Sequence, residues 1–224
     1  MDSTALETQA DQKPALDTAN DGLVNALKVF LKPLFKVLWR IEYRNLENVP
    51  HDLPGGLVIA SNHQTYLDPF WIGTPVKRKL RFLAWDKACN WFLIGPFIRK
   101  LGAFPVNLER GERQSIKTAI RVLKEGNTLV IFPEGSREFS DGKLLPFKPG
   151  TVRIALEAGV PILPVTITGG NKVWSQEDSY PGFKKVKITY HPLMEVKLPE
   201  NTTARVYAGQ LTEKLVEVIG SVKD

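Results

Sequence analysis

The stretch Leu57-Val58-Ile59-Ala60-Ser61-Asn62-His63 passes from four consecutive apolar residues to three polar ones. A short apolar run of this kind, bounded by polar residues, predicts a β-strand. Side chains that directly follow a strand lie at the edge of the sheet, where α/β proteins gather their functional groups. The stretch therefore predicts an α/β fold with a functional site beginning at His63.

Outward from this run, short β-rich segments alternate with helical patterns. The clearest helix is Glu112–Glu125, whose apolar residues share one face and which Gly126 ends. Residues 90–101 predict a helix broken at Gly95-Pro96. This alternation predicts a mixed, mostly parallel sheet flanked by helices, without repeats or an internal linker. The other predicted strands are 80–85, 103–106, 128–132, 161–167 and 185–190, and the other predicted helices are 151–158 and 203–219.

Charge is distributed unevenly along the chain. Residues 1–21 hold five acidic residues and one basic residue, so the net charge of +6 leaves +10 on the remainder. The polar, acidic start predicts a disordered tail, and it lacks the basic and apolar regions of a secretory signal. The basic remainder, 22–224, predicts anionic partners, and without a nucleic-acid motif or a long Lys/Arg run these are lipid or phosphate rather than nucleic acid.

Residues 22–41 read GLVNALKVFLKPLFKVLWRI and predict an amphipathic helix at a membrane interface. A transmembrane span would bury Lys32 near the bilayer centre and place Pro33 mid-span, and both are unfavourable. An interfacial helix avoids this, because its cations meet anionic headgroups and Trp39 lies at headgroup level. An ordinary helix packed on its own domain is the alternative. The polar residues form one stripe at steps of three or four: Asn25, Lys28, Lys32, Lys36 and Arg40.

His63 and Asp68 are the candidate catalytic pair. They stand five residues apart, so they meet only if the chain turns between them. A carboxylate on one imidazole nitrogen fixes the tautomer and leaves the other nitrogen free to accept a proton. The alternative is a structural histidine beside a helix-capping aspartate.

A second polar block, Phe132-Pro133-Glu134-Gly135-Ser136-Arg137, begins 64 residues after Asp68. Glycine allows close approach of the backbone to a ligand, and arginine binds phosphate through paired hydrogen bonds. Together with His63, this block suggests a base that activates a hydroxyl and a cationic cradle for an anionic substrate. A solvated loop arginine paired with a nearby glutamate is the alternative.

The sequence lacks the residues that other reaction types require. No G-x-S-x-G occurs, so a serine hydrolase elbow is absent. His51, His63 and His191 are far apart in the sequence, so no metal site is predicted. The single cysteine, Cys89, forms no intrachain disulfide, fits a reducing compartment and has no neighbouring histidine to activate it.

The ordered blocks resemble the glycerolipid acyltransferases of the lysophosphatidate acyltransferase type. That family carries N-H-x-[ST]-x-x-D, G-x-x-x-[VI]-x-R, F-P-E-G-[ST]-R and V-P-[IV]-x-P-V in this order. Asn62–Asp68 matches the first block, Phe132–Arg137 the third and Val160–Val165 the fourth, and Leu145–Gly150 is also typical. In the second block Gly102–Val106 fits, but Leu108 stands where the family has an arginine.

The resemblance implies transfer of a fatty acyl group from acyl-CoA or acyl carrier protein to a lysophospholipid hydroxyl, most simply that of 1-acylglycerol 3-phosphate. It implies His63 as base, oriented by Asp68, and no cofactor or metal. It places Glu134, Gly135 and Arg137 in the acceptor site, with Arg137 on the phosphate. Either Arg110 substitutes for the arginine missing at 108, or Arg137 binds the phosphate alone. The acyl or donor site would be lined by Val160, Pro161, Ile162 and Pro164.

The expected organisation is an acidic tail (1–21), an interface helix (22–41) and an acyltransferase domain (42–224). The protein is expected on the cytoplasmic face of a membrane, as a peripheral protein. Leu108 keeps a second acceptor open, another lysophospholipid or hydroxyl-bearing lipid. A non-catalytic lipid-binding protein is the alternative from another class, and the His63/Asp68 pair argues against it.

Overall fold

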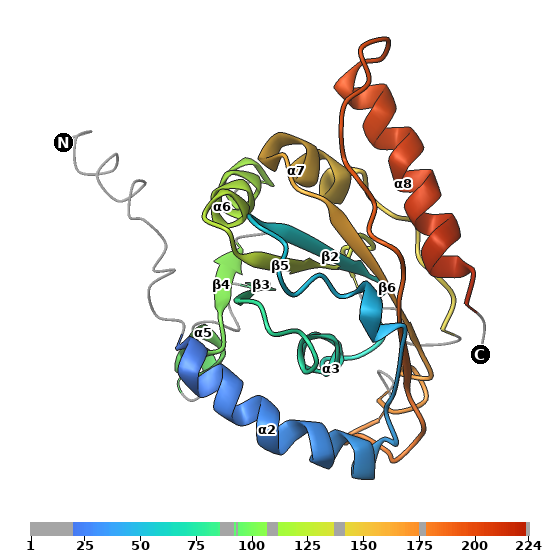
Figure 1. Ribbon diagram of the computed structural model, residues 1–224. Helices are drawn as coiled ribbons and strands as arrows, with labels where there is room; N and C mark the ends of the chain where they lie inside the picture. The colour runs from blue at the N-terminus through green and yellow to red at the C-terminus, as the bar shows by residue number, and fades with distance from the viewer. Residues whose placement is uncertain are drawn as a thin grey trace, which may run out of the picture.

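The computed structural model describes residues 20–85, 92, 94–106, 112–136, 142–174 and 178–222. Within them, one sheet has the strand order β1-β7-β6-β2-β5-β3-β4 (Figure 1). The five strands from β6 to β4 are parallel, whereas β7 pairs antiparallel with β6 and parallel with β1. The mixed, mostly parallel sheet is therefore confirmed. The strands are β1 (Glu42–Arg44), β2 (Leu57–Ser61), β3 (Leu80–Trp85), β4 (Ala103–Val106), β5 (Thr128–Ile131), β6 (Ile162–Thr168) and β7 (Lys187–Tyr190).

Helices cover both faces of the sheet, as Figure 1 shows. One core lies between the sheet and α6, α7 and α8, and it contains Val58 and Ala60 of β2. The other core lies under α2 and α3, and it contains Leu57 and Ile59. Alternate residues of one strand thus enter opposite cores, as the pleat requires. The helices are α2 (Asp21–Leu38), α3 (Asp68–Gly73), α5 (Ile94–Lys100), α6 (Glu112–Lys124), α7 (Gly150–Ala158), α8 (Ala204–Gly220) and the 3-10 helix η2 (Leu46–Asn48).

Two short elements lack a sequence signal, and one helix differs from its prediction. Strand β1 has three residues and α3 has six, and neither is long enough to show a period. Two tyrosine hydroxyls fix the end of α3, because Tyr43 donates to Trp71 O at 3.1 Å and Tyr190 to Ile72 O at 2.7 Å. The expected break at Gly95-Pro96 is wrong: α5 begins at Ile94, and Pro96 lies in its first turn, where no N–H is needed.

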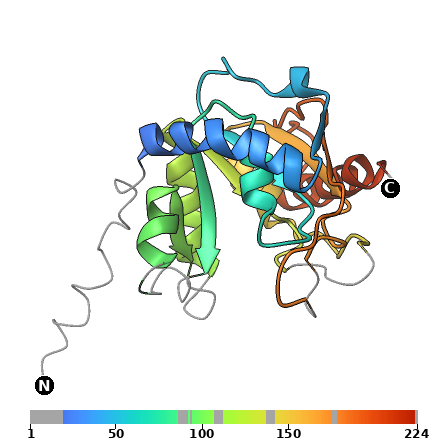
Figure 2. The ribbon, with the colours of Figure 1, turned by 90° about the horizontal axis from the view of Figure 1, so that it is seen from below.

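Helix α2 crosses the α3 side of the sheet from one edge to the other (Figure 2). At its start Asp21 pairs with Arg81 near the amino end of β3, at 3.2 Å. At its end the Trp39 indole donates to Gly182 O at 2.8 Å and contacts the Trp71 ring at a centroid distance of 5.4 Å. Trp39 is buried, so the expectation that it lies at headgroup level is wrong. A helix with two apolar faces buries one of them in its own domain, and Trp39 belongs to that face.

The outward side of α2 is also apolar. Val29, Phe30 and Val37 are 71%, 72% and 76% exposed, and Leu34 joins them. We call these four residues the outer apolar face of α2. No helix in the described part of the chain is long and apolar enough to cross a bilayer.

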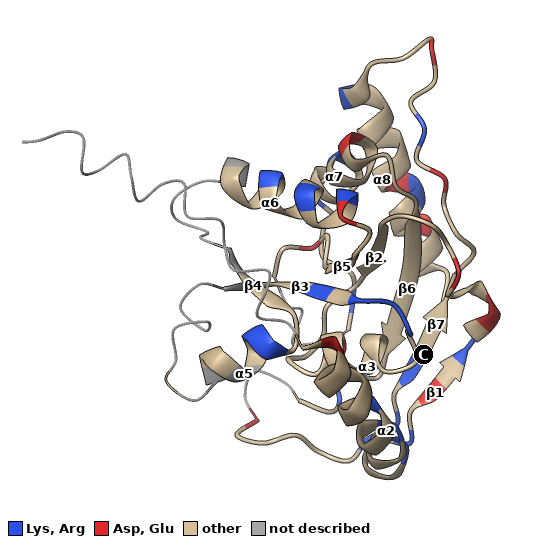
Figure 3. Ribbon diagram, turned by 60° about the vertical axis from the view of Figure 1, so that its left-hand side comes forward, with Lys and Arg blue, Asp and Glu red and all other residues tan. Residues whose placement is uncertain are grey.

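The predicted basic stripe of α2 is divided between solvent and protein. Lys32 and Lys36 are exposed, among the basic positions shown in Figure 3. Lys28 instead turns toward the domain, where its ammonium donates to Val76 O at 2.6 Å. Burial lowers the pKa of Lys28, and the nearby Asp21 carboxylate opposes that shift. The stripe therefore marks the boundary between the buried face and the solvent.

Candidate active site

The candidate site lies where β2, β5 and β6 end. These three strands are adjacent and parallel, so the residues that follow them meet at one edge of the sheet. Asn62 and His63 follow β2, Phe132–Glu134 follows β5, and Gly170 comes soon after β6. The topology thus brings together motifs that are about 70 and 100 residues apart in the chain.

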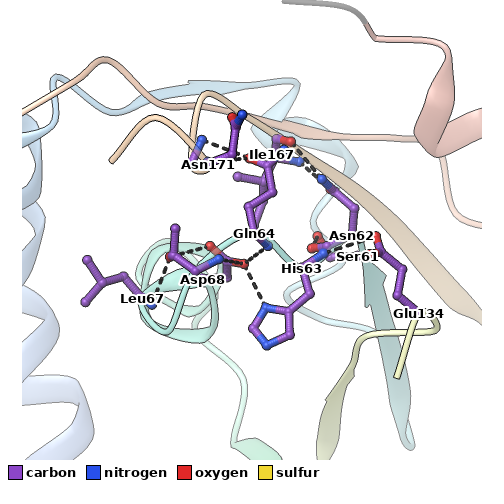
Figure 4. Close-up of polar contacts among 11 residues, drawn as sticks. Ser61, Asn62, His63, Gln64, Leu67, Asp68, Glu134, Ile167 and Asn171 are labelled. Atoms are coloured by element: carbon purple, nitrogen blue, oxygen red, sulfur yellow. Dashed lines mark hydrogen bonds and ion pairs between the residues drawn. The ribbon is translucent and has the colours of Figure 1, made fainter. Parts of the chain in front are cut away.

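The chain turns between His63 and Asp68, as the pairing requires. His63 Nδ1 donates to Asp68 Oδ2 across 2.8 Å (Figure 4). Asp68 begins α3, directly before the proline that occupies the first turn of that helix. Only six residues connect β2 to α3, and this short loop places the Asp68 carboxylate against the His63 imidazole.

The Asp68 carboxyl group is fully buried and accepts hydrogen bonds on both oxygens. Besides His63, Oδ2 accepts from the backbone N–H of Gln64 at 2.6 Å and of Thr65 at 2.9 Å. Oδ1 accepts from the Thr65 hydroxyl at 2.8 Å. A carboxylate is an acceptor-only group, and four donors suit it. The loop is thus built around this side chain, which fixes the position of the imidazole.

The imidazole is held on its face as well as at its edge. The Phe132 ring stacks on His63 with a centroid distance of 3.9 Å and an interplanar angle of 14°. Because Nδ1 carries the hydrogen that Asp68 accepts, Nε2 holds a lone pair. The His63 side chain is 18% exposed while that of Asp68 is 0% exposed, so the pair opens outward through the imidazole. This arrangement can remove a proton from a hydroxyl group at Nε2.

The neighbours of His63 point the other way and fasten the loop to β6. Asn62 Nδ2 donates to Ile167 O at 2.9 Å, and Ile167 N donates to Asn62 Oδ1 at 2.8 Å. Gln64 Oε1 accepts from Gly170 N at 2.8 Å. The alternation of β2 therefore continues past the strand, with His63 on one side and its two neighbours on the other. Gln64 was missed by sequence reasoning, although this period of two was a usable signal.

Comparison with known proteins bears on the chemistry of this edge. The family model described as "Acyltransferase" matches residues 40–168, which include the His63 loop and the strands that hold it. The chain belongs to the acyltransferase family.

Relatives of this acyltransferase carry more specific names. A protein from Bacillus subtilis named 1-acyl-sn-glycerol-3-phosphate acyltransferase is 36% identical over 146 residues, which cover 65% of this chain and 69% of the relative. A protein of the same name from Streptococcus pneumoniae is 34% identical over 139 residues, covering 59% of this chain and 50% of the relative. The crystal structure of PlsC, the 1-acyl-sn-glycerophosphate (LPA) acyltransferase from Thermotoga maritima, superposes with a TM-score of 0.70 and 26% identity. The superposition covers 89% of this chain and 80% of the Thermotoga maritima enzyme.

The turn after β5 supports the backbone of the His63 loop in this acyltransferase. Glu134 is 4% exposed, and its Oε1 accepts from the backbone N–H of His63 at 3.3 Å. One carboxylate thus holds the His63 side chain and another its main chain. The predicted role of Glu134 in lining the acceptor site stays a prediction.

Gly135 makes room for a lysine that sequence reasoning did not assign. Its φ is +71°, and a Cβ at this position would lie 2.9 Å from Lys148 Nζ. Lys148 is held there because its backbone N–H donates to Pro133 O at 2.9 Å. The glycine is therefore required for its backbone conformation and for the close approach of the Lys148 side chain. The typical Leu145–Gly150 segment was the available signal for this contact.

The remaining predicted site residues divide into two groups. Arg110 and Arg137 lie outside the described residues, as do Leu108 and Cys89. The residues predicted to line the acyl or donor site lie before β6 or in its first half, whereas His63 lies near the opposite end of that strand. Their role in lining the site stays a prediction: Val160, Pro161, Ile162 and Pro164.

Proposed function

We propose that this acyltransferase transfers a fatty acyl group from a thioester to the sn-2 hydroxyl of 1-acylglycerol 3-phosphate, giving phosphatidate. The observation that carries the proposal is His63, whose Nε2 is left as a base by the bond from Nδ1 to the buried Asp68. The names of the two bacterial relatives and of the Thermotoga maritima enzyme support the acceptor.

In the proposed reaction Nε2 of His63 accepts the proton of the lipid hydroxyl as its oxygen attacks the thioester carbonyl. Asp68 stabilises the imidazolium that forms. The tetrahedral intermediate collapses, the carbon–sulfur bond breaks, and the thiolate takes the proton from Nε2. Atoms and charges balance without an acyl-enzyme intermediate. The donor is acyl-CoA or acyl carrier protein, and no cofactor takes part.

The acceptor phosphate is proposed to bind Arg137, with Arg110 as a second cation and Glu134 and Gly135 beside them. Leu108 favours a second candidate acceptor, a different lysophospholipid or another hydroxyl-bearing lipid. A panel of such acceptors, assayed by release of free thiol with both donor types, decides between them. If none of the acceptors gives release of thiol, only a lipid-binding role remains.

An Arg137→Ala variant tests the phosphate site within the same assay. The proposal predicts a KM increase for lysophosphatidate that is much larger than the change in donor KM. An acceptor without phosphate, such as a monoacylglycerol, is the matched control, because its KM should not respond. A selective change in donor KM would assign Arg137 to the thioester instead.

An apolar cavity beside the site supports a lipid substrate. It has a volume of about 240 Å³ and lies between α2, α3 and β3. Leu67 and Pro69, which flank Asp68 in the chain, both contribute to its wall, opposite Leu31 and Phe35 of α2. A fatty acyl chain bound there would contact both chain neighbours of Asp68.

We further propose that α2 docks the protein on an anionic membrane, at the cytoplasmic face, through its outer apolar face. Exposed apolar side chains with Lys32 and Lys36 beside them fit the boundary between headgroups and acyl chains. Removing α2 is a poor test, because Phe35 and Trp39 belong to the core. Phe30→Ser with Val37→Ser should instead reduce flotation with phosphatidylglycerol vesicles and leave thermal unfolding unchanged. Equal flotation would exclude this role.

A further inference from the structure

A second exposed apolar element lies in the connection from β6 to β7. Tyr180 is 77% exposed and Phe183 is 67% exposed, and the exposed Lys184 follows them. Exposed aromatic side chains that lie close together form an apolar patch, and such patches mark interaction sites for proteins or membranes. We call residues 178–184 the aromatic loop.

The aromatic loop is tied to the end of α2. Trp39 donates to Gly182 O from its indole, and Val186 N donates to Trp39 O at 3.1 Å. Trp39 comes two residues after Val37, the most exposed member of the outer apolar face. In Figures 1 and 2 the orange segment that contains these residues approaches the end of α2. The aromatic loop therefore lies beside the end of α2.

The connection is also tied to the candidate active site. Gly182 N donates to Val173 O at 2.6 Å, and the next residue, Trp174, contacts the Tyr66 ring at a centroid distance of 5.5 Å. Tyr66 lies between His63 and Asp68 in the chain and is 57% exposed. Exposed aromatic residues thus extend from the end of α2 to the His63 loop.

The orientation of α2 places this apolar surface on the side of the site. Lys28 bonds to Val76 O, and Val76 lies between α3 and β3, near the amino ends of the parallel strands. Lys28 therefore lies toward the edge of the sheet opposite His63. The C-terminal end of α2 instead reaches Val186, which lies just before β7 at the edge where β6 ends. The last turns of the outer apolar face, the aromatic loop and Tyr66 thus border the edge that carries His63.

We propose that the aromatic loop is a second membrane contact, which turns the His63 edge toward the bilayer. Tyr180 and Phe183 enter the boundary between headgroups and acyl chains, where aromatic residues are favoured, and Lys184 meets anionic headgroups. Two separated contacts fix the tilt of the protein, whereas α2 alone permits rotation about its own axis. A lysophospholipid hydroxyl then reaches Nε2 without leaving the membrane. This inference rests on the proposed lipid acceptor and on docking through α2.

The test is a Tyr180→Ser/Phe183→Ser variant of the full chain. Binding to phosphatidylglycerol vesicles should weaken about tenfold or more, because two large apolar groups lose their burial. Turnover of long-chain lysophosphatidate in those vesicles should fall in parallel. Turnover of a short-chain, water-soluble lysophosphatidate should not change. Phe183→Trp should retain binding, since tryptophan suits the same boundary.

Val206→Ser is the matched control, because Val206 is 52% exposed on α8 in the other helical layer. Unchanged vesicle binding in the double variant, or an equal loss in the control, would overturn the proposal. A raised KM for acyl carrier protein with unchanged vesicle binding would also overturn it, by making the loop a carrier-docking surface. Vesicle binding needs no turnover, so failure of the proposed lysophosphatidate reaction would be seen separately.

Discussion

His63 and His191 each follow a strand of the same sheet, yet they lie at different positions along the strands and have different partners. His63 comes two residues after β2, and His191 comes directly after β7. Because β7 runs antiparallel to β6, it ends at Tyr190 beside Val165, in the middle of β6, and His191 N then donates to Pro164 O at 3.0 Å, toward the amino end of β6. The antiparallel direction of β7 thus separates His191 from His63, the candidate base.

The partners of the two imidazoles explain the difference. His63 bonds to a carboxylate, whereas His191 Nε2 lies 2.7 Å from the Thr166 hydroxyl, which itself donates to Ile219 O at 2.8 Å. Nε2 of His191 must therefore be the donor, and the residue links β6 to the end of α8. Burial lowers the pKa of His191. A hydrogen-bonded histidine becomes a candidate base only when its partner can stabilise the imidazolium and its second nitrogen faces the substrate.

The largest expected effect distinguishes the two histidines by activity. His63→Ala should lower kcat by about 10²–10⁴, the range for loss of a general base. His191→Ala should leave kcat within about a factor of three of wild type, because its side chain links β6 to the end of α8 and takes no part in the candidate site. Thiol release with saturating substrates measures both, and circular dichroism checks that each variant folds. Comparable losses in two folded variants would remove the distinction.

A smaller effect is expected from Asp68→Asn, which isolates the charge of the partner. The amide oxygen can accept the three bonds now made to Oδ2, and the amide nitrogen can donate to the Thr65 hydroxyl oxygen. The tautomer of His63 is then preserved, and only stabilisation of the imidazolium is lost. We expect kcat to fall by about 10–10³, as for one charge pair at intermediate dielectric, with acceptor KM unchanged. A loss as large as that of His63→Ala would show that Asp68 does more than supply charge.

The smallest effect concerns stability and pH. The pKa of His191 is lowered in the folded protein, so the unfolded chain binds a proton more readily, at an ordinary pKa of about 6.5. The free energy of unfolding should therefore fall as pH decreases below about 6.5, by at most about 1.4 kcal/mol per pH unit from this group. His191→Gln should show a shallower fall in urea unfolding at pH 7.5, 6.5 and 5.5. Parallel curves for the two proteins would exclude this contribution.

The sequence was sufficient for the strands that carry the site. The apolar runs of β2 and β5 were recognisable because these strands are buried on both faces, and the polar residues after them marked the functional edge. The contact between His63 and Asp68 was predicted and is confirmed by their 2.8 Å hydrogen bond. The sequence blocks and their order also indicated the acyltransferase family, and the comparisons show that the chain belongs to it.

Other features depend on partners that are remote in the chain. Gln64 bonds to Gly170, which lies 106 residues away, and the period of two indicates the side on which Gln64 lies but not this partner. The reversal of β7 depends on which edge of the sheet is free, so the sequence did not distinguish His191 from His63 by position. The positions predicted for Trp39 and Lys28 were wrong for a related reason. The hydrophobic period of α2 shows that apolar residues surround most of the helix, but not which of them the domain covers.

Helix α2 contributes to the protein core with one face and offers the other to a surface outside the molecule. A ligand that binds only the folded chain raises its apparent stability, and a bilayer is such a ligand if α2 docks on it. Because Phe35 and Trp39 belong to the core, binding of α2 to lipid would then stabilise the whole domain against unfolding. The melting temperature would depend on vesicle concentration, and detergent extraction would loosen the wall of the cavity beside Asp68.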